Sequence, residues 1–225
     1  MTAGMRIAID GPAAAGKSTI AKLVAKKLGY TYIDTGAMYR AITYKVLQNN
    51  IDPHNEEDIS KLIAQTEIEL QPDEHVQKVL LDGIEVTDAI RSHEVTTNVS
   101  AIAALTTVRE LLVAKQQSLA AESSVVMDGR DIGTAVLPEA ELKIFMTASV
   151  EERAQRRLLE EQKRGMKSDY ETLKKEISER DQADSEREIS PLKKAEDAIT
   201  IDTTGKTIEE VTNSIVEYAE KRLAQ

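Results

Sequence analysis

The chain has 225 residues, of which 41% are hydrophobic and 30% charged, a composition typical of a globular protein with its own core. It contains no cysteine, which excludes a disulfide scaffold, a thiolate metal site and a cysteine nucleophile. The net charge of −10 and the 3% aromatic content disfavour nucleic-acid binding. No apolar segment approaches the about 20 residues that span a bilayer, and the first residues lack a signal-peptide segment. We therefore expect a cytoplasmic protein with no nucleic-acid or membrane partner.

Short apolar segments alternate with longer amphipathic ones, which indicates strand–helix units around a parallel sheet. The apolar periodicity predicts helices at Lys17–Leu28, Thr106–Ala121 and Ile208–Leu223, the last with a capping box of Thr207 and Glu210. In the second helix, one face is expected to carry Val108, Leu111, Leu112 and Leu119. The predicted strands are Met5–Asp10, Tyr30–Ile33, Ser124–Asp128, Leu142–Met146 and Ala198–Asp202. The sequence therefore predicts an α/β fold with a five-stranded parallel sheet.

One segment breaks this alternation. Between Gln65 and Val86 the pattern predicts short strands at Glu67–Leu70, Val76–Leu81 and Ile84–Val86. Asp82-Gly83 separates the last two and is a strong hairpin signal, because a two-residue turn needs positive φ angles. We interpret this small antiparallel sheet as part of an inserted subdomain at residues 37–99.

The segment 11–18 matches the phosphate-loop pattern G-x-x-x-x-G-K-[ST] in full, after a predicted strand and at the start of a predicted helix. In such loops backbone N–H groups surround phosphate oxygens, the lysine reaches the β- and γ-phosphates, and the hydroxyl residue can ligate Mg²⁺. The predicted ATP-binding residues are Gly11, Pro12, Ala13, Ala14, Ala15, Gly16, Lys17, Ser18 and Thr19.

The motif Asp34-Thr35-Gly36-Ala37-Met38-Tyr39-Arg40 follows the second predicted strand directly. Site residues collect at the carboxyl ends of parallel strands, so we expect this turn to face the phosphate loop. Thr35 supplies a hydroxyl at a helix start, and Arg40 lies about one turn further on. Arg40 taken alone could instead be a solvated helix arginine.

A carboxylate and an arginine follow the third predicted strand. Asp128 ends this strand and suits the Mg²⁺-supporting position that P-loop enzymes carry on a neighbouring strand. Gly129 allows a sharp turn, and the guanidinium of Arg130 matches a phosphate bidentately, which a lysine cannot do. This concentration of charge directly after a buried strand favours a phosphate site.

A phosphate loop alone does not identify the acceptor. The sequence lacks the Asn-Lys-x-Asp motif that reads guanine, so a GTPase is disfavoured. The length suits a small kinase better than a motor, helicase or transporter ATPase. Two alternatives stay open at this point: a kinase for another small metabolite or nucleoside monophosphate, and a nucleotide-binding regulatory module.

The motifs at 11–18 and 34–40, together with Asp128-Gly129-Arg130-Asp131-Ile132-Gly133-Thr134 and Glu179-Arg180-Asp181…Asp184…Arg187, resemble the bacterial cytidylate kinase family. The resemblance runs over about residues 5–223. It implies a three-layer P-loop NTPase-type core at 1–36, 100–150 and 188–225, a monophosphate-binding insertion at 37–99, and a short helical lid with flanking helices at 151–187. The lid itself would lie near Arg153–Lys167, with Gly165 as its hinge.

The resemblance also implies the reaction and the residues that perform it. ATP would phosphorylate CMP or dCMP, giving ADP and CDP or dCDP, with Mg²⁺ as cofactor and a monomer as the working unit. The implied residues are Lys17, Arg130, Arg153, Arg157 and Arg187 for catalysis; Thr35, Arg40, Arg130 and Arg187 for the acceptor phosphate; Ser100, Arg109 and Asp131 for cytosine; Arg180 and Asp184 for ribose; and Ser18 and Asp128 for the metal. Which of Arg153, Arg156 and Arg157 enters the site stays open.

Two departures from the family pattern are minor. Thr35 stands where the family more often has serine, and the hydroxyl is kept. Ala13 and Ala14 stand where relatives can carry serine or glycine, and the backbone donors are unaffected.

The acceptor phosphate is its own nucleophile, so positioning and charge stabilisation can supply most of the catalysis. Asp131 has a competing interpretation, in which it only holds Arg130 or Arg187 in place.

Overall fold

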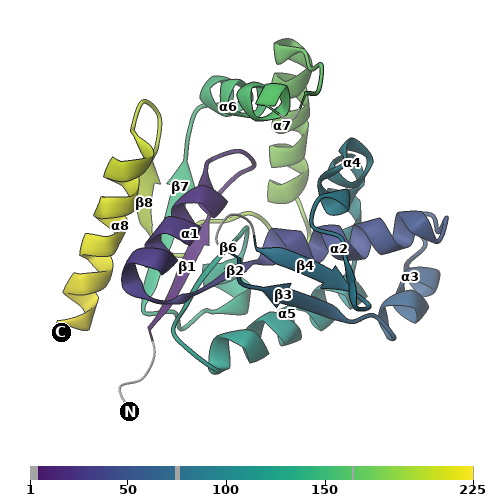
Figure 1. Cartoon of the computed structure of the whole chain (residues 1–225), viewed down its shortest axis with the longest axis horizontal. Coiled ribbons are helices and arrows are strands. Elements are labelled where there is room, and N and C mark those ends of the chain that lie inside the picture. The colour runs from purple at the N-terminus through teal and green to yellow at the C-terminus, as the bar shows by residue number, and fades with distance from the viewer. Residues whose placement is uncertain (1–4, 74–76, 164, 225) are drawn as a thin grey trace. The chain divides into compact units, whose positions relative to one another are not determined.

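A computed structural model describes residues 5–73, 77–163 and 165–224 of the chain (Figure 1). The chain forms two compact units, Met1–Tyr32 with Ser123–Gln225 and, between them in sequence, Ile33–Glu122. None of the helices in the described ranges is long and apolar enough to cross a membrane. The predicted insertion at 37–99 falls inside the second unit, and its division from a core and a lid stays a prediction.

The first unit is built on a five-stranded sheet with the order β2-β6-β1-β7-β8. Its strands are β1 (Arg6–Asp10), β2 (Thr31–Asp34), β6 (Val125–Gly129), β7 (Leu142–Thr147) and β8 (Ile199–Asp202). The central strand β1 pairs in parallel with β6 and β7, and β7 pairs in parallel with β8. The carboxyl ends of these strands therefore lie at one edge of the sheet, as the predicted α/β class requires.

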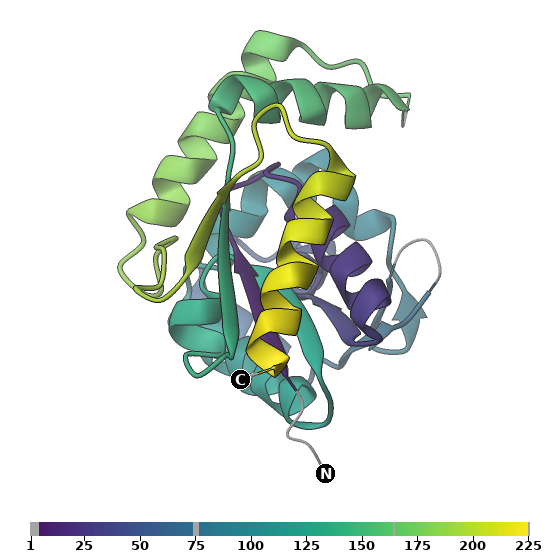
Figure 2. The same ribbon diagram turned by 90° about the vertical axis from the view of Figure 1, so that its left-hand side faces the viewer.

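Helices α1 (Lys17–Leu28) and α8 (Ile208–Leu223) pack against this sheet. Figure 2 shows α8 lying along the strands of the sheet beside α1. The apolar residues that they share with the strands include Ile7, Ile9, Val24, Ile144 and Ile215, all at most 1% exposed. Because Ile7 and Ile9 alternate with a period of two and the helical residues follow helical spacing, both elements turn an apolar face to one core.

The same unit contains two further helices, α6 (Val150–Lys163) and α7 (Tyr170–Ser185), which pack against each other. Gly165 lies between them with a φ of 76°, a conformation that favours glycine. The segment predicted as the lid thus corresponds to α6 and the turn after it, and Arg164 in that segment lies outside the described residues. The π-helical turn η2 (Ile132–Val136) follows β6 and packs against β1 and β6.

The second unit contains α2 (Thr35–Gln48), α3 (Glu56–Ile63), α4 (His93–Ile102), α5 (Thr106–Ala121) and the short 3-10 helix η1 (Ala89–Arg91). A three-stranded antiparallel sheet joins them, formed by β3 (Ile68–Gln71), β4 (Lys78–Leu81) and β5 (Ile84–Glu85). The hairpin residues Asp82 and Gly83 have φ angles of 52° and 79°, which confirms the predicted tight turn. Val76, which was predicted to begin the middle strand, lies outside the described residues.

The predicted fold class is confirmed, and most boundaries agree to within one residue. The three predicted helices begin and end where expected, and the capping box of Thr207 and Glu210 is present. The predicted apolar face of α5 is confirmed for Val108 and Leu112, both 0% exposed, but it is wrong for Leu111, which is 38% exposed. The buried residues of α5 also include Arg109 and Gln116, two polar side chains that the apolar pattern did not place there.

Candidate active site

The phosphate loop passes very close to the neighbouring strand β7. Gly11 has a φ of 149°, and a Cβ atom at this position would lie 2.1 Å from the backbone oxygen of Met146. No side chain fits there without displacing the backbone. The first glycine of the motif is therefore required by this close approach, which holds the loop over the end of the sheet.

The loop ends at the N-terminus of α1, and no side chain among the described residues caps this helix end. Gly16 occupies the cap position in the left-handed region, with a φ of 86°. By contrast, α2, α4, α7 and α8 each begin with a side chain that accepts a backbone N–H. The first turn of α1 thus offers its N–H groups and its positive dipole end to an anion. Ala14 is also left-handed, with a φ of 57°.

Lys17 is buried, and its ammonium donates to the carbonyl oxygen of Pro12 at 2.7 Å. Burial holds the pKa of Lys17 well below its ordinary value of 10.5, and the positive charges of Arg130 and Arg180 lower it further. The carboxylates of Asp128 and Asp10 act in the opposite direction. Several cations therefore converge on the phosphate loop, and an anionic phosphate placed there would relieve their repulsion.

Asp128 lies at the end of β6 and is 3% exposed. Its Oδ2 accepts from the Ser18 hydroxyl at 2.8 Å, and its Oδ1 accepts from the Tyr32 hydroxyl at 2.8 Å. The structure thus brings together the two predicted metal residues, and it adds Tyr32, which the sequence reasoning missed. A tyrosine in a predicted strand gives no sign of this contact, because it joins positions 96 residues apart.

The turn after β6 carries the next pair of predicted residues. Arg130 and Asp131 follow Gly129, and Asp131 is 4% exposed at the start of η2. The backbone oxygen of Asp131 accepts from the N–H of Val136 at 3.3 Å and that of Ile132 from the N–H of Leu137 at 2.7 Å, the five-residue spacing of a π-helical turn. The predicted strand-end turn is therefore compact and ordered by its own backbone bonds.

Asp184 organises the arginines of the first unit. It is 2% exposed near the end of α7, and its carboxylate accepts from Arg130 Nε at 2.9 Å and from Arg187 Nη2 at 2.6 Å. Burial alone would raise the pKa of Asp184, but the charges of Arg130, Arg180 and Arg187 outweigh it and hold that pKa below 3.8. Two predicted phosphate-binding arginines thus share one buried carboxylate. The competing interpretation, in which Asp131 only holds Arg130 or Arg187 in place, stays a prediction.

Two arginines of α6, Arg153 and Arg156, contact the phosphate loop. Arg153, which is 4% exposed, donates to the backbone oxygens of Ala148 at 3.0 Å and Ala13 at 3.1 Å. It also pairs with Asp181 of α7 at 2.6 Å.

Arg156 donates to the backbone oxygen of Thr203 at 2.8 Å and to that of Ala15 at 3.4 Å. Arg157 pairs with Glu160 on its own helix at 3.6 Å. Of the two lid arginines predicted to be catalytic, Arg153 therefore lies at the loop. Arg156, whose entry into the site the sequence left open, also lies at the phosphate loop.

The remaining predicted residues belong to the second unit. Thr35 is the first residue of α2 and is 2% exposed, while the capping residue is Asp34, whose carboxylate accepts from the N–H of Ala37 at 2.9 Å. Arg40 donates to the Thr96 hydroxyl at 2.8 Å, so it is not a purely solvated helix arginine.

The two cytosine candidates of this unit lie on different helices. Ser100 is half-buried on α4. Arg109 is 3% exposed on α5, and its guanidinium lies 5.7 Å from the centre of the Tyr39 ring, within range of a cation–π contact. Tyr39 is a partner that sequence reasoning did not identify.

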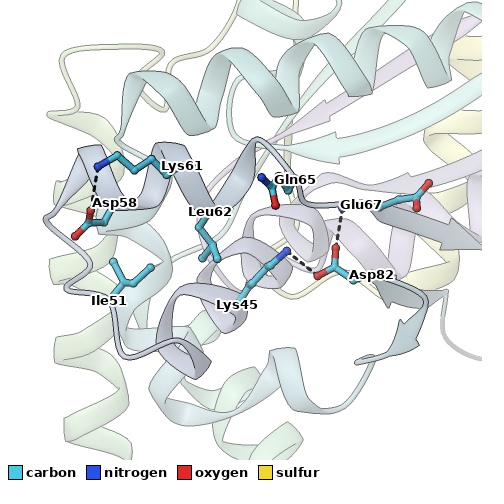
Figure 3. Close-up of a pocket in the computed structure, with 8 residues that line it drawn as sticks. All are labelled: Lys45, Ile51, Asp58, Lys61, Leu62, Gln65, Glu67 and Asp82. Carbon is cyan, nitrogen blue, oxygen red and sulfur yellow. Dashed lines mark hydrogen bonds and ion pairs between the residues drawn. The ribbon is translucent and has the colours of Figure 1, made fainter.

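A hollow of about 710 Å³ also opens on the second unit (Figure 3). Its lining residues are Lys45, Ile51, Asp58, Lys61, Leu62, Gln65, Glu67 and Asp82. Figure 3 shows the ion pair of Lys45 with Asp82, whose atoms are 2.6 Å apart, and the bond from the Glu67 N–H to the same carboxylate. These contacts tie the β4–β5 hairpin to α2 and to the start of β3. None of the predicted site residues lines this hollow.

Comparison with known proteins assigns the family. The family model described as cytidylate kinase matches residues 7–221. A cytidylate kinase of Geobacillus sp. (strain WCH70) is 59% identical over 223 residues, which cover 99% of this chain and 100% of that protein. A cytidylate kinase of Bacillus cytotoxicus is 58% identical over 217 residues, which cover 96% of each.

One solved structure, of an uncharacterised protein from Eubacterium ventriosum, shares the fold. Its TM-score is 0.54 at 13% identity, and the match covers 96% of this chain and 98% of that one. At this sequence identity the similarity shows only that the two chains share a fold. The match with the family model over nearly the whole chain, and the relatives at 58% and 59% identity, place this chain in the cytidylate kinase family.

Proposed function

We propose that this protein transfers the γ-phosphoryl group of ATP to CMP or dCMP, giving ADP and CDP or dCDP. One observation of the site carries the proposal: the phosphate loop and a pair of arginines on one buried carboxylate, Asp184, belong to the same unit. Arg130 of this pair follows the strand that carries Asp128. A phosphate donor site and a cationic acceptor site are the two parts that a nucleoside monophosphate kinase needs.

ATP is held by residues 11–19. The N–H groups at the start of α1 surround its β- and γ-phosphates, and Lys17 neutralises the charge that develops during transfer. In the structure Lys17 donates to the carbonyl of Pro12, so its ammonium already lies at the loop. Because the phosphates add negative charge beside Lys17, their arrival raises the pKa of Lys17 and favours its charged form.

The donor set at Ser18 and Asp128 fits Mg²⁺, since a hydroxyl and a carboxylate oxygen are hard ligands 2.8 Å apart. Within the described part of the chain, no group of three His, Cys, Asp or Glu residues could hold a metal by itself. This suits Mg²⁺, which enzymes of this kind bind through one or two protein groups and the substrate phosphates. When bound, the ion neutralises phosphate charge, and Tyr32 keeps the Asp128 carboxylate oriented.

The acceptor nucleotide is held by residues of three kinds. Arg130 and Arg187, with Thr35 and Arg40 of the second unit, bind its phosphate. Asp131 accepts from the exocyclic amino group of cytosine, and Ser100 and Arg109 bind the rest of the base edge. Arg180 and Asp184 bind the ribose. The structure supports these roles by the burial of Asp131 and Arg109 and by the fixed orientation of Arg130.

The acceptor phosphate attacks without a general base, because its oxygen is already ionised at neutral pH. Catalysis is then orientation and electrostatic stabilisation, supplied by Lys17, Arg130 and Arg187. Arg153 and Arg157 of the lid add positive charge and exclude water, which suppresses hydrolysis of ATP. We propose further that the protein works as a monomer in the cytoplasm, where its nucleotide substrates are, without a nucleic-acid or membrane partner.

A coupled assay of ADP formation tests the proposal with CMP, dCMP, UMP, AMP and GMP at saturating MgATP. We expect CMP and dCMP to be phosphorylated far faster than the others. Equal use of all acceptors, or a preference for AMP or GMP, would assign the chain another monophosphate. Slow turnover that no acceptor stimulates would instead identify a nucleotide-binding regulatory module.

A further inference from the structure

Asp10 is the last residue of β1, immediately before Gly11, and it is 4% exposed. Its Oδ1 accepts from the N–H of Ile132 at 2.8 Å, and its Oδ2 accepts from the N–H of Gly133 at 2.7 Å. Ile132 and Gly133 begin η2, directly after Arg130 and Asp131. A single carboxylate therefore joins the strand that leads into the phosphate loop to the turn that carries the acceptor-binding residues.

These two hydrogen bonds are strong because the Asp10 carboxylate is charged and the site excludes water. Burial raises the pKa of Asp10 to about 6, against the opposing effect of the two backbone N–H groups. The charged neighbours that face it, Asp131 and Lys17, act in opposite directions. Asp10 is thus ionised at neutral pH, and only the ionised carboxylate offers an acceptor on both oxygens.

The partner turn fits closely against this carboxylate. A Cβ atom at Gly133 would lie 3.4 Å from Asp10 Oδ2 and 3.1 Å from Cδ of Lys143. The Lys143 ammonium in turn donates to Asp197 at 3.0 Å and to the backbone oxygen of Pro138. The glycine therefore lies between two held side chains, so the start of η2 has little room to shift.

We propose that Asp10 is a positioning residue for the acceptor nucleotide, which acts by fixing the backbone of Ile132 and Gly133 and so the placement of Arg130 and Asp131. Asp10 affects the bound substrate only through this turn and itself contacts neither nucleotide. The inference rests on the proposed roles of Arg130 and Asp131 in binding CMP. It explains why a buried charge is kept beside the phosphate loop, where an apolar residue would be less costly to bury.

The test is Asp10→Asn, which keeps the shape of the side chain but replaces one acceptor oxygen by an N–H₂ donor. One of the two turn N–H groups then faces a donor and loses its bond. We expect the KM for CMP to rise about 10- to 100-fold, the range for loss of a hydrogen bond to a charged group. The affinity for a fluorescent ATP analogue should stay within a few-fold of wild type, because residues 11–19 are unchanged.

Gly133→Ala perturbs the same contact from the other partner and leaves Asp10 and the phosphate loop intact. The added methyl group would crowd Cδ of Lys143 at 3.1 Å and would touch Asp10 Oδ2 at 3.4 Å, so the turn must shift slightly against the carboxylate. This variant should therefore also raise the KM for CMP while sparing ATP affinity. Asp52→Asn is the control, because Asp52 is exposed and asparagine can replace its bond from the His54 N–H. The control should match wild type in every measurement.

The amide ¹H–¹⁵N signals of Ile132 and Gly133 report directly on the two hydrogen bonds that these N–H groups donate to Asp10. Both should move upfield in Asp10→Asn, since they lose the charged acceptor. An unchanged KM for CMP in both variants, or a loss of ATP affinity equal to the loss for CMP, would overturn the proposal. So would a lower melting temperature with unchanged kinetics. Wild-type protein that does not phosphorylate CMP would refute the proposed function instead, so the two failures are distinguishable.

Discussion

Replacing Asp184 by asparagine should uncouple Arg130 and Arg187, the two arginines proposed to bind the acceptor phosphate. The change removes one negative charge from a site that is 2% exposed and that receives Arg130 at 2.9 Å and Arg187 at 2.6 Å. Breaking a buried ion pair costs about 3–5 kcal/mol. Arg130 is 20% exposed and asparagine keeps one acceptor oxygen, so we expect the lower end, about 3 kcal/mol.

For a chain of this length, 1 kcal/mol corresponds to about 2–4 °C, so the melting temperature should fall by about 6–12 °C. The pKa of Asp184 lies below its ordinary value of 3.8, so its carboxylate stabilises the fold above that pH. The stability difference between wild type and variant should therefore be constant from pH 5 to 8. It should shrink only as the pH falls below 3.8, through the folded-state pKa.

Activity should fall with stability, because both guanidinium groups lose their fixed orientation. We expect kcat/KM for CMP to drop at least about 100-fold, the order that misplacement of binding groups produces. Urea unfolding and coupled kinetics measure the two effects on the same samples. Glu186→Gln is the control, since it removes the same charge from an exposed position two residues along the chain. An Asp184→Asn variant that matches this control in stability and in KM would refute the reasoning.

Three further results are expected. Lys17→Ala should lower kcat at least about 100-fold with an unchanged circular dichroism spectrum, and wild-type turnover would show that the loop is not catalytic. Arg130→Lys should be nearly as damaging as Arg130→Ala in KM for CMP, because a point charge cannot make the two-pronged contact; full activity of the lysine variant would contradict a phosphate role. The stability of wild type relative to Asp10→Asn should decrease by about 3 kcal/mol as pH rises from below 3.8 to above 6, since native Asp10 holds its proton up to a pKa of about 6. Urea unfolding at several pH values checks this, and a flat difference would contradict it.

The sequence was sufficient for features that depend on local pattern. The phosphate loop, the helix at Lys17–Leu28, the capping box at Thr207 and the hairpin at Asp82-Gly83 each depend on neighbouring residues, and all are confirmed. The burial of Arg109 and Gln116 on α5 was not predicted, because tertiary contacts can bury polar side chains that apolar periodicity assigns to the surface.

The contacts that organise the site could not be predicted from the sequence either. Asp184 meets Arg130 across 54 positions, and Tyr32 meets Asp128 across 96. Asp10 accepts from Gly133, which lies 123 positions further along the chain. Each depends on which strands are neighbours in the sheet or on how α7 packs, and motif spacing carries no information on either. The motifs predicted that Arg130, Asp184 and Arg187 matter, but not that one buried carboxylate holds both arginines.

The central claim is that the turn after β6 selects cytidine monophosphates. Cytosine presents an amino donor where uracil presents a carbonyl acceptor, so a buried carboxylate can distinguish the two. The deciding measurement is kcat/KM for CMP and for UMP in wild type and in Asp131→Asn. We predict a strong preference of the wild type for CMP that narrows in the variant, through loss of CMP activity rather than gain with UMP. A ratio that Asp131→Asn leaves unchanged, with both acceptors falling by the same factor, would contradict base reading by this turn.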